Sequence, residues 1–364
     1  MIDFELEADL ELVQQTAQEF AGHHLRPELR SHEAARSVAE AARAAFDEIG
    51  FAGLELPEAQ GGSGLGALAR CLVLEELGAG DPGAALALDP LGPALYPLLE
   101  LGGENALAEL GGPLLRQPGA RAVLVWNGPG GRSHLERRGD RVHGRVPWVP
   151  ADRVDLLVVL DEAGAFAVAE GVACEELRGA GLRAAGASAL TLDAARVCGE
   201  WRDPAGARRA LARARLYVAA LLLGLTRESA EYSRRYALER VAFGKPIAHH
   251  QALAFLIADM ASAVDCARVL VWDAAWRLDL GEEATEPCAS AFIEAAEQAM
   301  FVTPNGVQIL GGHGFMQDYP VEKFMREGRA LSLLLGGVDC ARELAGQELA
   351  ATRGRVALNL EGLA

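Results

Sequence analysis

The sequence has no long apolar run, no closely spaced cysteine pair and no basic excess, and each absence excludes a class of protein. The longest apolar run, residues 216–225, is too short to span a bilayer and predicts a buried helix segment. The six cysteines are scattered without a C-x-x-C pair, which predicts reduced core thiols in a cytoplasmic protein. The acidic start, residues 1–5, lacks the basic and apolar segments of a signal peptide.

The charge balance is strongly acidic, with 34 Lys+Arg against 51 Asp+Glu and a formal net charge of −17. This argues against nucleic acid or a membrane surface as the main partner. A phosphate-bearing ligand stays possible, because a few local arginines suffice to bind one. There is no P-loop and no G-x-S-x-G motif. His23, His24 and His32 have no cysteine or carboxylate at metal-ligand spacing, so we expect surface histidines and no metal site.

Hydrophobic spacing divides the 364 residues into three parts. An apolar stripe at three- and four-residue spacing over residues 6–20 predicts helices in residues 1–115. Residues 116–205 contain short β-favouring runs between Gly, Pro and Asp, which predict a small β domain. Helical spacing returns in residues 206–364, where a stripe over 253–264 marks one long helix. We therefore expect a mainly α protein with a small β domain. The predicted strands are residues 122–126, 142–148, 155–160, 165–169 and 189–197.

The first candidate site begins at Arg240 and continues through Phe243 and Gly-Lys-Pro to His250 and Gln251. A guanidinium at a helix end binds a diphosphate with two hydrogen bonds. Phe243, two turns from Gln251, is suited to flank an adenine or a flavin. The alternative is that Arg240 pairs with a surface carboxylate and Phe243 is a core residue, and the segment alone leaves both open.

The second candidate site places Gln308 before the double glycine Gly311-Gly312 and His313. Glycines let a ligand approach the backbone closely, and their amides can meet phosphate oxygens. The pattern is not G-x-G-x-x-G and follows a helix, so a Rossmann site is disfavoured. The alternative is a glycine-rich helix break, in which His313 is a hydrogen-bonded loop residue and not an acid or base.

A third candidate is the pair Arg213 and Arg215, which precedes the apolar run. As a binding site, the pair holds acidic groups of a coenzyme A tail, with Arg215 contacting the substrate. The equally open alternative is a solvated helix start.

Together these segments resemble the acyl-CoA dehydrogenase family, and the resemblance runs nearly end to end. The two C-terminal segments, at their separation, are its most specific parts. The matching stretches are residues 49–64, 74–77, 190–197, 240–251, 256–260 and 308–326, which include Gly-Gly-Ser-Gly at 61–64 and Tyr-Pro-Val-Glu-Lys at 319–323.

The resemblance implies a helical N-terminal domain, a β-barrel middle domain and a four-helix C-terminal domain, assembled as a homo- or hetero-oligomer, usually a dimer of dimers. It implies dehydrogenation of an acyl-CoA or acyl-carrier thioester, in which a carboxylate removes the α-proton and hydride passes to FAD. Electron-transfer flavoprotein is the implied electron acceptor. In the family, the FAD of a neighbouring subunit is contacted by residues matching Arg240, Phe243, His250, Gln251, Gln308, Gly311 and Gly312.

The sequence departs from the family at the catalytic base. Counted from Met325-Arg326, the position of the usual glutamate is Leu335, which cannot accept a proton. A position used by some relatives on the earlier helix corresponds to Ala214, and Asp339 would point elsewhere along its helix. The catalytic residue is therefore unassigned.

The middle domain departs as well. Relatives carry a Thr-Glu-Pro…Gly-Ser-Asp loop and a Trp-Ile-Thr/Ser segment that donate hydrogen bonds to the flavin ring. This chain has residues 126–133 and Trp148-Val149-Pro150 in their place. Pro150 offers neither a hydroxyl nor an N–H.

Three functions fit these observations. The Leu335 N–H remains available to polarise a thioester oxygen, and the Leu-Gly-Gly segment is similar to that of base-less subunits in heteromeric acyl-CoA dehydrogenases. The first hypothesis is therefore a subunit that works with a base-bearing partner. The second is a homomeric flavoenzyme with a non-standard base, and the third is a non-enzymatic scaffold for acyl-CoA or an acyl carrier. The acyl chain is not identified.

Overall fold

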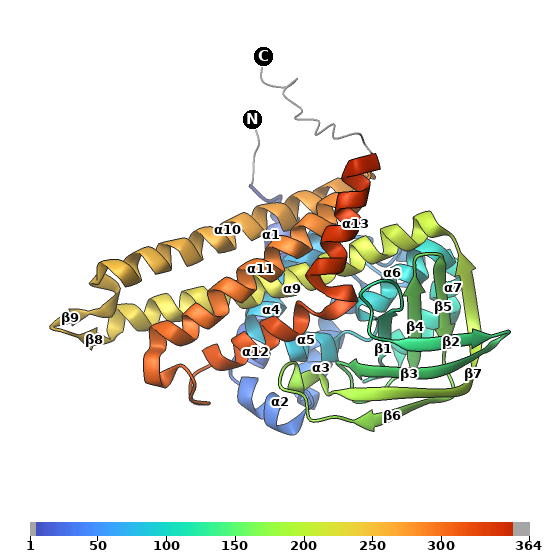
Figure 1. Ribbon diagram of the computed structural model, residues 1–364, viewed down its shortest axis with the longest axis horizontal. Coiled ribbons are helices and arrows are strands. Elements are labelled where there is room, and N and C mark those ends of the chain that lie inside the picture. Colours follow the sequence, from blue (N-terminus) through green and yellow to red (C-terminus); the bar gives the residue numbers. More distant parts are fainter. Residues whose placement is uncertain (1–4, 352–364) are drawn as a thin grey trace, which may run out of the picture.

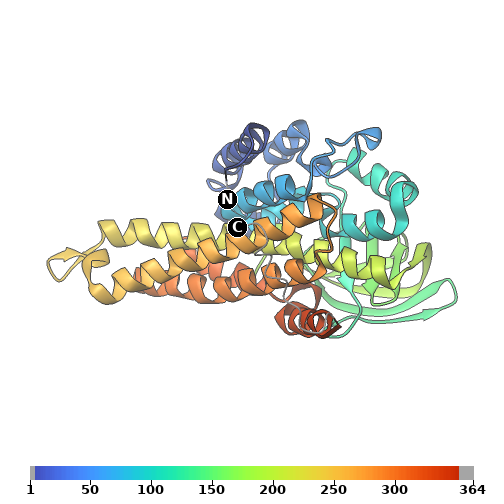
Figure 2. The ribbon, with the colours of Figure 1, turned by 90° about the horizontal axis from the view of Figure 1, so that it is seen from above.

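The computed structural model describes residues 5–351 and consists of helices, a small sheet and a long helical bundle, in that order (Figure 1). This arrangement confirms the predicted mainly α fold with a small β domain. Residues 1–4 of the acidic start and residues 352–364 of the predicted C-terminal domain lie outside the described residues. Figure 2 shows the bundle running past the N-terminal helices and the sheet, with the β8–β9 hairpin at its far end.

The N-terminal helices surround α4 (Ala67–Gly80), which is buried along almost its whole length. It packs against α1, α10 and the long helix α9. Beside it, Phe20, Phe46 and Phe51 meet edge to face, with ring centroids 5.6 to 5.9 Å apart. The other α-helices of this part are α1 (Ala8–Phe20), α2 (Leu29–Ala35), α3 (Glu40–Ile49), α5 (Pro82–Leu88), α6 (Leu95–Pro97), α7 (Gly103–Ala106) and α8 (Gly112–Arg116).

The middle part is a seven-stranded sheet in the order β1-β4-β5-β7-β3-β2, with β6 also paired to β7. The first half of β7 pairs with β3 and β6 and its second half with β5. The two halves of the sheet therefore share this strand, and their inward Val, Leu and Phe side chains form one core cluster. The strands are β1 (Ala122–Trp126), β2 (His134–Arg138), β3 (Arg141–Val149), β4 (Leu156–Asp161), β5 (Gly164–Val168), β6 (Val172–Glu176) and β7 (Ser188–Arg202).

The C-terminal part begins with α9, where Asp203 caps the helix by accepting a hydrogen bond from the Ala205 amide. Its Gly224 allows close contact with α4, because a Cβ there would lie 1.8 Å from the Glu75 carbonyl oxygen. In the described part of the chain, no helix has the length and apolar character needed to cross a membrane. The elements are α9 (Pro204–Glu239), β8 (Val241–Ala242), β9 (Lys245–Pro246), α10 (Gln251–Asp279), α11 (Thr285–Leu310), α12 (Val321–Leu331) and α13 (Gly337–Ala351).

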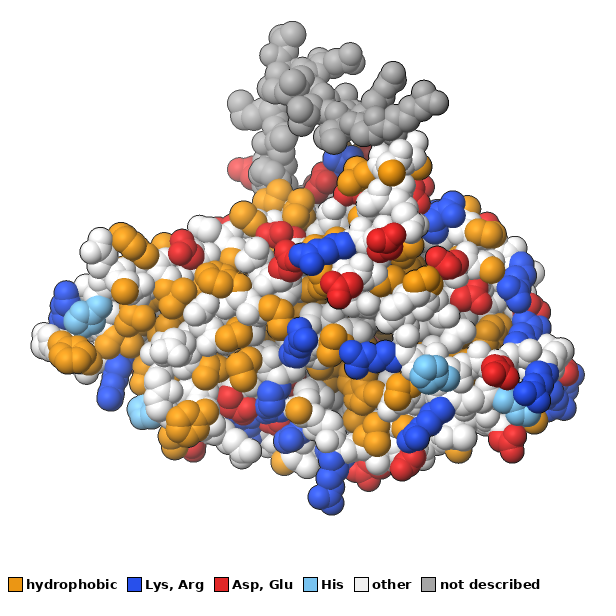
Figure 3. All heavy atoms as spheres, in the orientation of Figure 1, with side chains coloured by type: hydrophobic (Ala, Val, Ile, Leu, Met, Phe, Trp, Pro, Cys, Tyr) orange, Lys and Arg blue, Asp and Glu red, His pale blue; other side chains and the backbone are white. Residues whose placement is uncertain are grey.

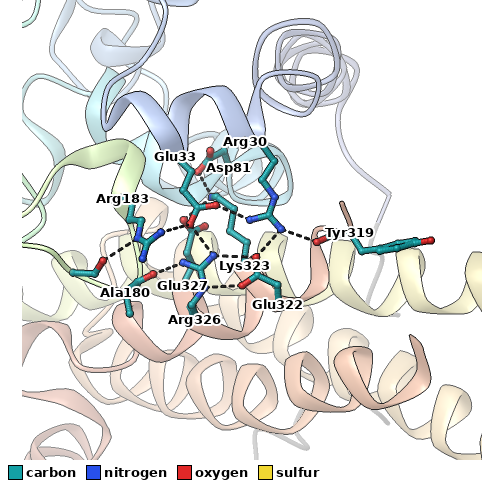
Figure 4. A network of polar contacts seen from close by, with 11 residues as sticks. Arg30, Glu33, Asp81, Ala180, Arg183, Tyr319, Glu322, Lys323, Arg326 and Glu327 are labelled. Atoms are coloured by element: carbon teal, nitrogen blue, oxygen red, sulfur yellow. Dashed lines mark hydrogen bonds and ion pairs between the residues drawn. The ribbon is translucent and has the colours of Figure 1, made fainter. Parts of the chain in front are cut away.

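A buried ion-pair network fastens α12 to the N-terminal helices (Figure 4). Lys323 is fully buried, and its Nζ donates to Asp81 at 2.9 Å and to Glu327 at 2.5 Å. Next to it, Arg326 pairs with Glu33 at 2.7 Å and donates to a backbone carbonyl between β6 and β7. The network therefore connects all three parts of the chain.

Two predictions about the burial of particular side chains are wrong. His32 is only 2% exposed because it lies on the inward face of α2, and burial lowers its pKa. Neither of its ring nitrogens has a hydrogen-bond partner among the described residues. The cysteines are free, as expected, but Cys174, Cys198 and Cys266 are exposed and do not belong to the core.

Candidate functional site

The position predicted for the catalytic base lies in a tight turn between α12 and α13. Leu335 is the middle residue of the 3-10 turn η10 (Leu334–Gly336) and has φ 53° and ψ 38°. This left-handed conformation is costly for a residue with a side chain, so its surroundings must hold it. Its side chain is 7% exposed, and a Cβ at Gly336 would lie 2.9 Å from Cys340, so the turn is tightly packed.

Arg215 on α9 supports this turn from inside the protein. Its side chain is 2% exposed, and its Nη2 donates to the Leu335 carbonyl oxygen at 3.0 Å and to the Cys340 Sγ at 3.2 Å. Burial lowers the pKa of Arg215. Arg213 points elsewhere and pairs with Glu55 at 2.8 Å. The structure thus places neither arginine on a free surface facing a coenzyme A tail, and the solvated helix start is equally absent.

A cavity of about 380 Å³ opens beside Leu335, with walls from β1, the β1–β2 loop, β3 and the segment from α12 to η10. Figure 3 shows this face, where basic side chains gather around apolar ones between α12 and the strands. Among the described residues that line this cavity, the charged ones are Arg132, Arg326 and Arg329. None of these described lining residues is Asp, Glu, His, Lys, Cys or Tyr. Asp339 is exposed and lines a neighbouring depression instead.

The two middle-domain segments that depart from the resemblance both border this cavity. The Trp126 Nε1 donates to the Pro129 carbonyl at 2.9 Å, and the Ser133 hydroxyl donates to the Asn127 Oδ1 at 2.7 Å. Both side-chain donors are therefore already used inside the loop. Pro150 also lines the cavity, where it provides no donor.

The first candidate segment forms the hairpin at the far end of the bundle. Phe243 is at its tip, 95% exposed, and its ring meets the His250 ring edge to face with centroids 6.0 Å apart. The His250 Nε2 is 3.1 Å from the Ala242 carbonyl oxygen. Arg240 and Gln251 are exposed, and within the described part of the chain no carboxylate pairs with the Arg240 guanidinium. The alternative of a core Phe243 and an ion-paired Arg240 is therefore wrong.

The second candidate segment ends α11 at the same end of the bundle, and one apolar cluster joins the two segments. Gly311 has φ 57° and ψ −128°, a conformation that favours glycine. A Cβ at Gly311 or Gly312 would meet nothing within 4 Å, so the bare backbone faces open space, and Gln308 is exposed beside it. His313 lies 2.8 Å from the Tyr236 hydroxyl and stacks on Tyr319, which confirms a hydrogen-bonded loop histidine.

Known proteins resemble this chain over nearly its full length. The acyl-CoA dehydrogenase N-terminal domain matches residues 7–116, and the acyl-CoA dehydrogenase C-terminal domain matches residues 205–350. Benzylmalonyl-CoA dehydrogenase of Aromatoleum aromaticum is 29% identical, covering 92% of this chain and 96% of that protein. Cyclohex-1-ene-1-carbonyl-CoA dehydrogenase of Geobacter metallireducens is 31% identical, covering 85% and 90%. The chain belongs to the acyl-CoA dehydrogenase family.

A solved structure agrees. The Tcur3481–Tcur3483 steroid acyl-CoA dehydrogenase, in a variant form, superposes with a TM-score of 0.80 at 26% identity, covering 95% of this chain and 99% of that chain. Family membership makes the protein an oxidoreductase that acts on CH–CH bonds of acyl thioesters, and it implies FAD as the cofactor. Gly311 and Gly312 leave their backbone uncovered, and at the same end of the bundle Arg240 has no ion-pair partner among residues 5–351, so these residues are chemically suited to a diphosphate such as that of FAD.

Proposed function

We propose that this chain is an FAD-binding subunit of an acyl-CoA dehydrogenase and works with a partner subunit that supplies the carboxylate base. One observation carries the proposal. None of the described residues that line the cavity beside Leu335 has a side chain that can accept a proton at neutral pH. Ala214, the other position at which relatives place a base, is fully buried and equally inert. The α-proton of a thioester bound here therefore has no acceptor among the described residues that line this cavity.

The chain keeps two other parts of the reaction. The Leu335 N–H polarises the thioester oxygen from a turn that Arg215 holds in place. The apolar walls, with Trp126 and Trp148 among them, exclude water and orient the acyl group. Bound FAD supplies hydride acceptance.

The predicted FAD residues serve the cofactor of a neighbouring subunit. Arg240 directly follows the last residue of α9 and comes 25 residues after Arg215, which corresponds to roughly 38 Å at about 1.5 Å per residue. Arg240 is therefore far from the cavity at Leu335, and the two can act on FAD together only across a subunit contact. We propose a dimer of dimers in which Arg240, Phe243, His250, Gln251, Gln308, Gly311 and Gly312 contact a neighbour's FAD.

The substitution Gly312→Ala tests this cofactor site. The added Cβ meets nothing within 4 Å in the chain, so the free energy of unfolding of the FAD-free protein should stay within about 0.5 kcal/mol of wild type. FAD retention after gel filtration, measured by absorbance, should fall because the methyl group occupies the backbone face that the diphosphate needs. Gly346→Ala, also without a neighbour within 4 Å and remote from the site, is the matched control. Unchanged FAD retention in Gly312→Ala contradicts the site.

Co-expression with a paralogue that carries glutamate at the position of Leu335 tests the partner. The expected product is a flavin-containing hetero-oligomer that oxidises an acyl-CoA, with each subunit alone inactive. A yellow homo-oligomer bleached by an acyl-CoA favours the homomeric enzyme instead, and a colourless protein that binds acyl-CoA favours the scaffold.

Two further features complete the proposal. The free cysteines are compatible with the reducing cytoplasm. An electron-transfer flavoprotein is the proposed acceptor of the electrons.

A further inference from the structure

Two arginines beside the Leu335 cavity have no acidic partner in the described part of the chain. Arg132, in the β1–β2 loop, is exposed and forms no hydrogen bond or ion pair with residues 5–351. Arg329, in the last turn of α12, is exposed as well, and its only polar contact among these residues is a weak one to the Met300 Sδ at 3.8 Å. Asp and Glu outnumber Lys and Arg by 51 to 34, so two cations left unpaired beside one cavity are unusual in this chain.

The two arginines lie where the cavity beside Leu335 meets the neighbouring depression that Asp339 lines. The first space has a volume of about 380 Å³ and the second of about 480 Å³, both within the roughly 300–1,000 Å³ of small-molecule sites. The second space extends along the start of α13 and the facing side of α11. A ligand that extends from one space into the other passes both arginines, because the same residues of the β1–β2 loop and of the segment from α12 to η10 line both spaces. These shared residues are Gly130, Arg132, Arg329, Leu333 and Gly336.

The other charged residues around the two spaces leave this junction positive. Arg326 and Arg342 are each neutralised by glutamate. Among the described residues that line the two spaces, Asp339 is the only carboxylate without a basic partner. The charges of Arg132 and Arg329 together exceed that of Asp339, and the first N–H groups of α13, which face the second space, add to the positive potential. The junction is therefore suited to an anion with more than one negative charge.

We propose that Arg132 and Arg329 bind the diphosphate of a nucleotide that extends across the two spaces. Each phosphate of a diphosphate linkage carries a negative charge, and a guanidinium binds phosphate oxygens with two parallel hydrogen bonds. The inference rests on the proposed function, which brings two such nucleotides to this site, FAD and the coenzyme A of the thioester. The only hydroxyl of the β1–β2 loop, on Ser133, is already bonded to Asn127. Arg132 therefore replaces, with a charge, donors that this loop lacks relative to the family.

Two titrations of the full-length protein test the proposal, FAD into the FAD-free protein and coenzyme A into the FAD-saturated protein. In the double variant with Arg132→Met and Arg329→Met, the dissociation constant of one nucleotide should rise roughly ten- to a hundred-fold, the range of lost hydrogen bonds to charged groups. This loss should shrink as salt is added, because salt screens exposed charges. The urea unfolding curve of the FAD-free protein should not move, because neither arginine has a strong partner within residues 5–351. Arg178→Met is the matched control and should keep both affinities, because Arg178 is also exposed and unpaired among these residues but lines neither space.

The outcomes identify the nucleotide and separate the inference from the proposed function. A selective loss of FAD affinity places the FAD diphosphate at the two arginines, opposite Arg240 of the neighbouring subunit. A selective loss of coenzyme A affinity places the coenzyme A diphosphate there instead. Wild-type affinity of the double variant for both nucleotides, or a loss that salt does not reduce, overturns the inference and leaves the proposed function standing. If the wild-type protein binds neither nucleotide, the proposed function fails and the inference fails with it.

Discussion

Leu335→Glu is expected to make the isolated flavoprotein reducible by an acyl-CoA. The side chain at 335 is buried next to the cavity, so a carboxylate there reaches a thioester bound beside the backbone N–H. Arg215, bonded to the carbonyl of the same residue, keeps the new carboxylate ionised and able to accept a proton. Restoring a general base should raise the rate of flavin reduction by roughly 10²–10⁴ over the wild-type chain. Anaerobic bleaching of the flavin absorbance on addition of acyl-CoA measures it.

Leu335→Gln is the matched control, because glutamine has the shape of glutamate but its side chain accepts no proton at neutral pH. Asp339→Asn in the Leu335→Glu background should change nothing, because Asp339 is exposed and lines a different depression. Bleaching by wild type and Leu335→Gln at the rate of Leu335→Glu would mean that another residue is the base. No bleaching in any of the three would mean that the cavity has lost more than its base.

Much of the fold was predictable because its elements have strong hydrophobic patterns. The five predicted strands correspond to β1, β3, β4, β5 and β7, which have buried faces. Within this sheet the pattern missed β2, whose residues are mostly polar, and β6, whose residues are mostly exposed, and it also missed the two-residue strands β8 and β9. Such strands form because β3 and β7 offer unpaired backbone edges, and a local sequence pattern does not report that tertiary cause.

Candidate site residues could be predicted where they belong to a sequence motif. They could not be predicted where their position depends on which side chains are buried. The resemblance singles out Gly311, Gly312 and Phe243, and their segments lie at one end of the bundle, but the local sequence left open whether Phe243 is exposed or in the core. Arg215 was expected to contact acidic groups, but the sequence does not show that it is buried behind Leu335. His32 was assigned to the surface for the same reason. Whether a polar side chain faces inward depends on which face of its helix packs against the rest of the protein. The usual pattern of apolar residues on buried helix faces does not predict a charged residue there.

Lys323→Met should strongly destabilise the folded protein. The substitution keeps an apolar stem of similar length but leaves Asp81 and Glu327 buried without their shared cation. Removing one partner of a buried ion pair costs about 3–5 kcal/mol, and here the pair also joins α12 to the N-terminal helices. Urea unfolding followed by far-UV circular dichroism measures the loss. Lys245, the only other lysine in the chain, is exposed, so Lys245→Met is the matched control and should cost less than about 0.5 kcal/mol.

The loss in Lys323→Met should shrink as the pH falls. Burial raises the pKa of Glu327 to about 7 even with Lys323 beside it, and removing the lysine raises this pKa further. Because the folded pKa lies above the unfolded one, the stability that protonation of Glu327 contributes is fully present below the unfolded pKa, near 4.5, and is lost as the pH rises through 7. Unfolding curves of the variant at pH 5 and pH 8 should therefore differ more than those of wild type. Equal losses of unfolding free energy at both pH values would show that Glu327 does not take up the proton. A loss below about 1 kcal/mol at pH 8 would show that the buried lysine does not hold α12 to the N-terminal helices.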